Sequence, residues 1–366
     1  MKARVCVITS AHSAFDVRIF YKQACWLAEA GYSVVLLGRH CRHEFVQGVE
    51  VIGLPSPRNR LHRMTTYLWR IYKLALSQQA EIYHFHDPEF ALAALLLRLK
   101  RKKVIYDVHE DYSQAIRRRY WVPAVVRNAI AWLASTAERA AARRYTAVVA
   151  ATEYIAARFS NPETITVKNY PVLSNFLQPD NRPNDRVIYI GGISRSRGAL
   201  EMVAAMERLG AEENVRLTLL GSFLEPDLSE ELQKMPGWKF VDYHGQVARE
   251  EVWSNLSRAA VGLVCLHPLP AYETSLPVKL FEYMYAGIPV VASDFPFWHQ
   301  FVRNNSCGLH VDPLNSDEIA KAISYLLENP VEAQKMGNNG RKAVLQKYNW
   351  EQESIKLLEL YSRLIR

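Results

Sequence analysis

A glycine-rich turn at residues 191–198, GGISRSRG, combines groups that can bind an anion. It follows the apolar run VIYI and precedes ALEMVAAM, which has the periodicity of a helix. A turn that opens a helix presents free backbone N–H groups and the positive end of the helix dipole. Arg195 and Arg197 add two permanent charges, so with Gly191 and Gly192 the segment suits a diphosphate. An ordinary turn with two solvated arginines is the alternative, because neither a GxGxxG fingerprint nor a P-loop is present.

A second segment, SLPVKLFEYMYAGIPVVAS at residues 275–293, places Lys279 and Glu282 three residues apart on one side of a short helix. A carboxylate in this position can accept hydrogen bonds from two vicinal hydroxyls, as one that binds a ribose does. The alternative is a surface Lys–Glu pair, which stabilises a helix by only about 0.2–0.5 kcal/mol.

Histidines and carboxylates gather where predicted strands end in the first half of the chain. His109 ends the segment VIYDVH and is flanked by Asp107, Glu110 and Asp111, and the segment HFHDPEF contains His86 and Asp87. The carboxyl end of a parallel strand is where an α/β sheet places its chemistry. A polar loop cluster is the alternative for the His109 segment. The two histidines of HFHDPEF also suggest a metal site, which we do not expect because a third ligand is missing.

The exit of the first predicted strand, TSAHSAFDVRIF, adds three polar residues to the same half of the chain: His12, Asp16 and Arg18. The guanidinium of Arg18 can reach a phosphate or pair with Asp16. We favour the structural pair.

The elements that must position these residues alternate along the whole chain. Short β-branched runs, such as 5–9, 104–108 and 187–190, alternate with amphipathic stretches such as 20–30 and 199–209. This alternation predicts β-α-β units with buried parallel sheets. About six strands on each side of a break predict two doubly wound α/β domains that face each other and bind ligands at their strand carboxyl ends.

The break lies at residues 169–185, where Pro, Asn and Asp cluster and the periodicity disappears. We therefore predict an N-terminal domain at 1–170 and a C-terminal domain at 171–349. The last segment, 350–366, is predicted as a helix that packs back on the first domain.

Charge is distributed unevenly over the 366 residues. Residues 1–170 contain 25 Lys and Arg against 13 Asp and Glu, whereas residues 171–366 contain 20 against 24. The basic residues cluster at 58–63, 98–103, 117–121 and 127–144, the last two with interleaved aromatic residues. Basic amphipathic segments with tryptophan are typical of surfaces that bind anionic lipid. We do not expect nucleic acid, because no nucleic-acid-binding motif accompanies the charge, and a solvated basic face is the other alternative.

Cysteine usage and hydropathy indicate the compartment. The five cysteines are scattered without a CxxC pair, which argues against a zinc ribbon or a disulfide framework and favours a reduced cytoplasm. The first residues do not form a signal peptide, and no apolar run approaches the ~20 residues of a membrane span. We expect a soluble cytoplasmic protein, able to lie peripherally on the inner face of the cytoplasmic membrane.

The segments at 191–198 and 275–293 together resemble the nucleotide-binding half of retaining GT-B-fold glycosyltransferases, the "group 1" class or glycosyltransferase family 4. FEYMYAGIPVVASD is a close match to one family motif, and the resemblance extends over essentially the whole chain. It implies the GT-B fold, with an acceptor-binding domain at 1–170 and a nucleotide-sugar-binding domain at 171–349.

The resemblance also assigns roles on the donor side. Glu282 matches the acid that binds the ribose hydroxyls, and Arg197 matches a lysine that binds the diphosphate. The family's arginine position is occupied by Gly192, so Arg195 is the candidate substitute.

The family's first motif glutamate has no direct counterpart. Its position is Thr274, with Glu273 one residue out of register, so donor-sugar recognition departs from the family pattern. Lys279 is a candidate contact to phosphate or sugar, and Ser275 and Leu276 can offer backbone N–H groups to the diphosphate.

The activity implied is transfer of a sugar from a UDP- or GDP-sugar to a glycan acceptor with retention of configuration, without metal or cofactor. In the family a histidine after the matching strand lies beside the transferred sugar. The catalytic candidates are therefore His109, Arg197 and Lys279. The acceptor-side candidates are His12, Asp16, Arg18, His86, Asp87, Glu110 and Asp111.

A lipid-linked saccharide at an anionic membrane surface is the expected acceptor, in bacterial surface polysaccharide or lipopolysaccharide synthesis. The alternatives are a nucleotide-sugar epimerase or phosphorylase of the same fold, and a non-catalytic subunit of a polysaccharide assembly complex. A dehydrogenase is least favoured, because no dinucleotide fingerprint follows the first strand.

Overall fold

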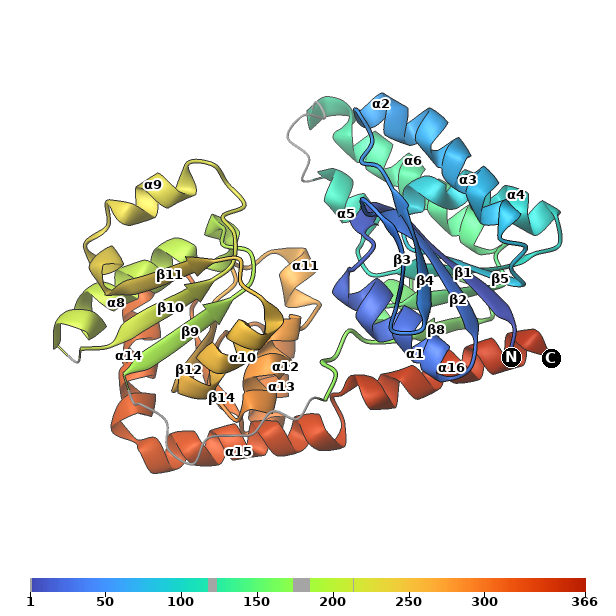
Figure 1. Ribbon diagram of the computed structural model, residues 1–366. Helices are drawn as coiled ribbons and strands as arrows, with labels where there is room; N and C mark the ends of the chain where they lie inside the picture. Colours follow the sequence, from blue (N-terminus) through green and yellow to red (C-terminus); the bar gives the residue numbers. More distant parts are fainter. Residues whose placement is uncertain (1, 118–123, 174–184, 213) are drawn as a thin grey trace. The chain divides into compact units, whose positions relative to one another are not determined.

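The computed structural model describes residues 2–117, 124–173, 185–212 and 214–366. The chain divides into two compact units: Met1–Asn169 with Trp350–Arg366 form unit 1, and Tyr170–Asn349 form unit 2 (Figure 1). Each unit is a sheet with helices on both faces, which confirms the predicted pair of doubly wound α/β domains. Residues 174–184 of the predicted break and residues 118–121 of one basic cluster lie outside the described residues.

The sheet of unit 1 has the strand order β3-β4-β2-β1-β5-β6-β7-β8. Every neighbouring pair is parallel except β3 with β4, which form an antiparallel hairpin. This hairpin is absent from the sequence prediction. The strands are β1 (Arg4–Ser13), β2 (Ser33–Arg39), β3 (His43–Val46), β4 (Val49–Leu54), β5 (Ile82–Phe85), β6 (Lys103–Val108), β7 (Ala147–Ala150) and β8 (Thr164–Thr166).

Helices cover both faces of this sheet. Those of unit 1 are the π-helical η1 (Val17–Ala24), α1 (Cys25–Glu29), α2 (Arg60–His62), the π-helical η2 (Arg63–Tyr67), α3 (Leu68–Ser77), the short 3₁₀ helix η3 (Pro88–Phe90), α4 (Ala91–Leu99), α5 (Tyr112–Arg117), α6 (Ala124–Ala142), α7 (Glu153–Ala156) and α16 (Trp350–Ile365). The last of these, α16, packs in unit 1 beside the chain's amino end (Figure 1). Its Tyr361 is fully buried, and the Tyr361 hydroxyl lies 2.8 Å from Nδ1 of His84.

Unit 2 has an all-parallel sheet in the order β11-β10-β9-β12-β13-β14. Its strands are β9 (Arg186–Ile190), β10 (Arg216–Leu220), β11 (Val241–Gly245), β12 (Val261–Val264), β13 (Val290–Ser293) and β14 (Gly308–Val311). Its helices are η4 (Arg195–Arg197), α8 (Ala199–Glu212), α9 (Leu228–Gln233), η5 (Pro236–Phe240), α10 (Arg249–Arg258), α11 (Pro270–Glu273), α12 (Val278–Ala286), α13 (Pro296–Asn305), α14 (Ser316–Glu328) and α15 (Pro330–Gln346).

The packing of the core explains why the strands are continuous apolar runs in the sequence. In β9, Val187 and Tyr189 belong to the core under α8, whereas Ile188 belongs to the core under α12. Successive side chains of a strand point to opposite faces, so a sheet covered on both faces needs an apolar residue at every position. No helix of the described residues is long and apolar enough to cross a membrane.

Candidate functional site

The glycine turn of unit 2 begins where β9 ends, and a lysine from α12 lies against it. The ammonium group of Lys279 is buried, and it has no hydrogen-bond partner among the described residues. It lies 3.4 Å from the centre of the Tyr189 ring and 3.4 Å from the position that a Cβ at residue 191 would occupy. Gly191 has a φ of +113°, which L side chains rarely adopt. The turn therefore holds a buried cation close to the carboxyl end of β9.

A second cation lies in the same turn. Arg197 donates from Nη1 to the carbonyl oxygen of Gly192 at 3.1 Å and is half-buried. A Cβ at residue 192 would come within 2.8 Å of the same nitrogen. The guanidinium of Arg197 and the side chain of Leu224 thus fill the space next to Gly192. Arg197 and Lys279 are therefore brought together, as the sequence predicted.

Arg195 is placed differently from Arg197. Its guanidinium pairs with three carboxylates, those of Glu225, Asp227 and Glu231, and the Arg195–Asp227 distance is 2.9 Å. Its backbone N–H also donates to Glu225 at 3.1 Å. A guanidinium held by three carboxylates is already neutralised. The structure therefore gives no support to Arg195 as the substitute cation for a diphosphate.

Glu282 is buried on α12 and does not form the surface pair with Lys279 that the sequence allowed. Its Oε1 accepts a hydrogen bond at 2.6 Å from Nη1 of Arg249, the first residue of α10. The Lys279 ammonium faces the Tyr189 ring instead. Arg249 is a site residue that sequence reasoning missed, because 33 residues separate it from Glu282 and no motif contains it.

The loop before α12 holds the remaining donor-side candidates. The hydroxyl of Thr274 donates to the carbonyl of Pro270 at 2.8 Å, and that of Ser275 donates to Ala271 at 2.7 Å. The backbone N–H of Ser275 donates to Tyr272 at 3.3 Å, so it is not free for a diphosphate as predicted. Leu276 is a partly buried contact of the core under α12.

In unit 1, the carboxylate of Asp87 is enclosed by the end of β1. Its Oδ2 accepts from the Thr9 hydroxyl at 2.9 Å and from the backbone N–H groups of Ser10 and Ala11 at 2.6 and 3.2 Å. The other oxygen lies 3.4 Å from Nε2 of His12. The predicted acceptor-side residues His12 and Asp87 are therefore adjacent.

Asp107, at the end of β6, is the centre of a buried ionic cluster. Arg18 donates to both of its oxygens at 3.0 Å, and Gln23 donates to Oδ2 at 2.7 Å. The predicted Arg18–Asp16 ion pair is wrong: Asp16 instead caps η1 by accepting the Arg18 backbone N–H at 2.8 Å. Asp107 was out of reach of sequence reasoning as the partner, because 89 residues separate it from Arg18.

His84, His86 and Asp107 lie close enough to hold a metal ion, with ligand atoms within 4.8 Å of one another. Asp107 is the third ligand that the sequence pattern lacked. Its two oxygens are already bound by Arg18, and a guanidinium repels a second cation at the same carboxylate. The cluster is therefore better described as an ion-pair network than as a metal site. Burial lowers the pKa of His86 to about 4, so this imidazole is neutral.

His109 connects the Asp107 cluster to a cavity of about 200 Å³. Its Nδ1 lies 3.7 Å from Asp107 Oδ1, and its Nε2 lies 3.3 Å from Nε2 of His12. Five predicted residues line this cavity: His12, His86, Asp87, His109 and Glu110. The predicted Asp111 does not line it and pairs with Arg158 at 3.1 Å.

The electrostatics of the cavity define the state of His109. Burial by itself lowers the pKa of His109, but attraction to the carboxylate of Asp107, 3.7 Å from Nδ1, outweighs it and raises the pKa. The carboxylate also favours the tautomer in which Nδ1 carries the proton. Neutral His109 with its proton on Nδ1 has a lone pair on Nε2, which can accept a hydrogen bond from the neighbouring His12 ring or from a hydroxyl that replaces it.

Comparison with known families identifies the chain. The family described as "Glycosyl transferases group 1" matches residues 177–343, and the one described as "Glycosyl transferase 4-like domain" matches residues 17–167. The chain belongs to the group 1 glycosyltransferases. The two matches follow the two units, and the first contains the glycine turn and α12.

Relatives of this glycosyltransferase are distant in sequence. The MMP alpha-(1->4)-mannosyltransferase of Mycolicibacterium hassiacum is 25% identical over 210 residues, which are 56% of this chain and 50% of the relative. The chain therefore spans half of that relative's length. The glycogen synthase of Mycobacterium tuberculosis is 21% identical over 92% of this chain and 87% of the relative.

Solved structures show the same fold over the whole chain. Sucrose-phosphate synthase from Thermosynechococcus elongatus has a TM-score of 0.75 at 20% identity and covers 99% of both chains. Anabaena Alr3699/HepE in complex with UDP-glucose has a TM-score of 0.74 at 13% identity, over 99% of this chain and 100% of the other. These likenesses confirm the predicted GT-B fold.

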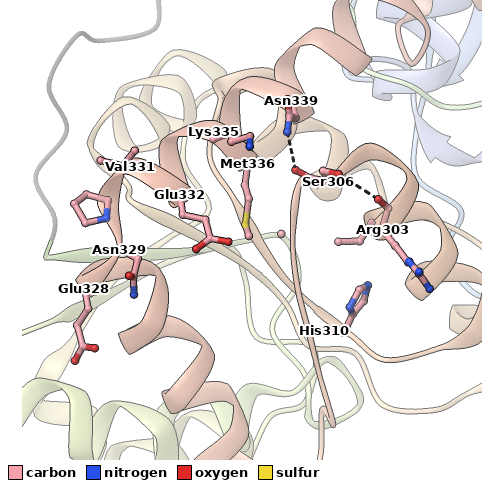
Figure 2. A pocket seen from close by; sticks show the side chains of 13 residues that line it. Arg303, Ser306, His310, Glu328, Asn329, Val331, Glu332, Lys335, Met336 and Asn339 are labelled. Atoms are coloured by element: carbon pink, nitrogen blue, oxygen red, sulfur yellow. Dashed lines mark hydrogen bonds between the residues drawn. The ribbon is translucent and has the colours of Figure 1, made fainter.

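Unit 2 also contains a larger hollow, of about 830 Å³, that does not include the residues of the glycine turn or of α12 (Figure 2). It lies beside the start of β14 and the start of α15, and Figure 2 shows His310, Glu332 and Lys335 around it. None of the predicted site residues lines it. In a parallel sheet the chemistry lies at the carboxyl ends of the strands, so we do not place the glycosyltransferase site here.

Proposed function

We propose that this glycosyltransferase moves a sugar from a nucleotide-diphosphate sugar to a glycan acceptor, with retention of configuration and without a metal or cofactor. The observation that carries the proposal is the ammonium group of Lys279, buried without a hydrogen-bond partner among the described residues and beside the half-buried Arg197. A buried cation needs a counter-charge, and a diphosphate at the glycine turn supplies one.

Each unit contributes a separate part of the proposed reaction. In unit 2, Glu282 binds the ribose hydroxyls, while Arg197 and Lys279 stabilise the charge that develops on the leaving diphosphate. In unit 1, Nε2 of His109 accepts a hydrogen bond from a hydroxyl of the transferred sugar, and the cavity around Asp87 receives the acceptor. We propose a front-face route in which the leaving phosphate takes the acceptor's proton, so no carboxylate nucleophile is required.

A UDP- or GDP-sugar is the proposed donor. Anabaena Alr3699/HepE, which has the same fold, has been solved with UDP and with UDP-glucose. The two cations are suited to the diphosphate that both donors share, and Glu282 is suited to their common ribose.

We further propose that the acceptor is lipid-linked and that unit 1 lies against an anionic membrane, as in bacterial surface polysaccharide synthesis. Helices α3, α4 and α6 cover one face of the unit 1 sheet (Figure 1). They expose large apolar side chains: Trp69, Leu92, Leu96, Leu99, Val125, Val126, Ile130, Trp132 and Leu133. Basic residues lie in or just after these helices, among them Arg98, Lys100, Arg101 and Arg127. Apolar side chains within a basic surface match the chemistry of an anionic bilayer.

The donor proposal is tested by incubating the protein with UDP-, GDP- and dTDP-sugars without acceptor and measuring released nucleotide and free sugar. Slow hydrolysis of one nucleotide sugar is expected, and it should be lost in Glu282→Ala but kept in Glu251→Ala, an exposed glutamate of α10. Epimerised nucleotide sugar without hydrolysis would indicate the epimerase alternative instead.

The membrane proposal is tested by sedimentation with vesicles that contain anionic lipid. The double variant Trp132→Ser, Leu133→Ser should sediment less than the wild type. The matched control Leu314→Ser changes an exposed leucine of unit 2 and should sediment like the wild type. Equal sedimentation of all three proteins would contradict the proposal.

A further inference from the structure

Arg249, a cation at the protein surface, pairs with the carboxylate of Glu282. The side chain of Glu282 is 8% exposed, whereas that of Arg249 is 47% exposed. Among the described residues, the ion pair between Arg249 and Glu282 is the only one that the carboxylate makes. Arg249 therefore lies on the solvent side of a carboxylate that the rest of unit 2 covers.

We propose that Arg249 is a positioning residue for the nucleotide, holding the Glu282 carboxylate in the orientation in which its two oxygens can accept hydrogen bonds from the two ribose hydroxyls. The inference rests on the ribose role proposed above for Glu282. It deepens that role by assigning ribose recognition to a pair of residues from α10 and α12.

The hydrogen-bonding capacity of the carboxylate allows Arg249 and a ribose to bind at the same time. A carboxylate has two oxygens with about four lone-pair sites, and Arg249 uses one of them at Oε1. A vicinal diol needs one site on each oxygen. Arg249 therefore need not leave when the ribose binds. It does not compete with the ribose for the carboxylate, as a positioning residue must not.

Arg249 is itself held in place by its own helix. Its guanidinium lies 4.7 Å from the centre of the Trp253 ring, which is four residues further along α10. Trp253 in turn packs edge-on against Tyr285 of α12, with ring centres 5.7 Å apart. The side chain that orients Glu282 is thus fixed by contacts to both helices, and little freedom remains to be lost when a ligand binds.

Lys279 does not duplicate this function. It lies three residues before Glu282 on α12, but its ammonium faces the Tyr189 ring. Loss of Arg249 would therefore leave the carboxylate without the ion pair that orients it. A carboxylate that is no longer held in one orientation makes weaker hydrogen bonds to ribose hydroxyls, whereas contacts to the diphosphate are untouched.

The experiment compares nucleotides with and without the 2′-hydroxyl, by calorimetry on wild type, Arg249→Ala, Arg249→Lys and the control Arg258→Ala. Arg258 is exposed at the far end of the same helix. The probes are UDP and GDP, each with its 2′-deoxy form. We expect the wild type to prefer the tighter-binding nucleotide over its 2′-deoxy form by roughly ten-fold, because the lost bond is to a charged acceptor.

In Arg249→Ala that preference should fall to about two-fold, with the dissociation constant for the 2′-deoxy form nearly unchanged. Arg249→Lys should restore part of it, and Arg258→Ala should match the wild type. Equal weakening of both nucleotides in Arg249→Ala, or full preference retained, would overturn the inference while the ribose role of Glu282 stands. A wild type that binds neither UDP nor GDP would instead refute the proposed function, and the inference with it.

Discussion

The ammonium group of Lys279 lies over the face of Tyr189, 3.4 Å from the ring centre, while the hydroxyl of the same tyrosine donates to the carbonyl of Gly192 at 2.8 Å. One side chain therefore fixes both the cation and the turn that it faces. Burial, and then repulsion from Arg197, lower the pKa of Lys279 well below its usual value. The charged form is therefore disfavoured until an anion arrives.

Binding of a diphosphate should consequently take up protons. An anion at the glycine turn stabilises protonated Lys279, so its pKa rises and a fraction of a proton is bound with each UDP at neutral to alkaline pH. Calorimetry in two buffers of different ionisation enthalpy measures this uptake as a difference in the apparent binding enthalpy. Uridine, which lacks the diphosphate, is the control and should give equal enthalpies in both buffers. Equal enthalpies for UDP as well would contradict the prediction.

The buried charge should also cost stability. A lysine whose folded pKa lies below its unfolded pKa binds fewer protons in the folded state, so unit 2 gains stability as the pH rises from the folded pKa toward the unfolded value near 10.5. Lys279→Met removes the cost, so at pH 7 the variant should be more stable by about 1–3 kcal/mol. It should bind UDP at least ten-fold more weakly, which calorimetry and urea unfolding at pH 7 and pH 10 can measure. If Lys279→Met were less stable than the wild type, the Lys279 charge would have to be compensated within the folded protein, and the prediction would be wrong.

The fold was largely predictable because it depends on patterns that are local in sequence. β6 and β9 each begin one residue before the predicted runs 104–108 and 187–190 and end with them, because the interior strands of a sheet covered on both faces are mostly apolar. The hairpin of β3 and β4 was missed because β3 is an edge strand of only four residues, none of them buried. Its turn at Gln47 and Gly48, with φ of 49° and 79°, is the signal that could have revealed it.

The site was predictable only in part. Gly191, Arg197 and Lys279 could be grouped because they belong to the two motifs that resemble the family, one directly after β9 and the other on α12. Partners far apart in the sequence could not be assigned, as Arg18 with Asp107 and Arg249 with Glu282 show. Charge alone does not distinguish Arg195 from Arg197, because the carboxylates that neutralise Arg195 lie at least 30 residues away.

The Arg18–Asp107 pair should dominate the electrostatic stability of unit 1. Both side chains are at most 4% exposed, and removing one partner leaves a buried charge without compensation. Asp107→Asn should lower the free energy of unfolding by about 3–5 kcal/mol. The exposed pair of Arg363 and Glu163 is the control. Arg363→Ala should change the free energy of unfolding by less than about 1 kcal/mol. Thermal unfolding followed by circular dichroism compares the two variants, and similar losses in both would contradict the assignment.

The pH dependence of turnover should report His109. Only its neutral form presents a lone pair to a substrate hydroxyl, and Asp107 raises the pKa of His109 above its usual value of 6.5. The kcat/KM should therefore rise with pH through a midpoint above 6.5, rather than below it as burial alone would give. His109→Gln, which offers an amide oxygen at any pH, should lower kcat/KM and remove this limb of the profile. A limb that persists in His109→Gln would assign the titration to another group.

Arg195 and Arg197 should differ in their effect on nucleotide binding although only one residue lies between them. Arg195→Ala removes a cation that three acidic side chains already neutralise, so UDP affinity should stay within about two-fold of the wild type. Arg197→Ala removes the half-buried guanidinium at Gly192, so it should weaken UDP by about ten-fold or more and uridine little, because only UDP has the diphosphate. Calorimetry with both ligands on both variants measures the difference. If Arg195→Ala weakened UDP as much as Arg197→Ala, the three carboxylates would have to release Arg195 when the diphosphate binds.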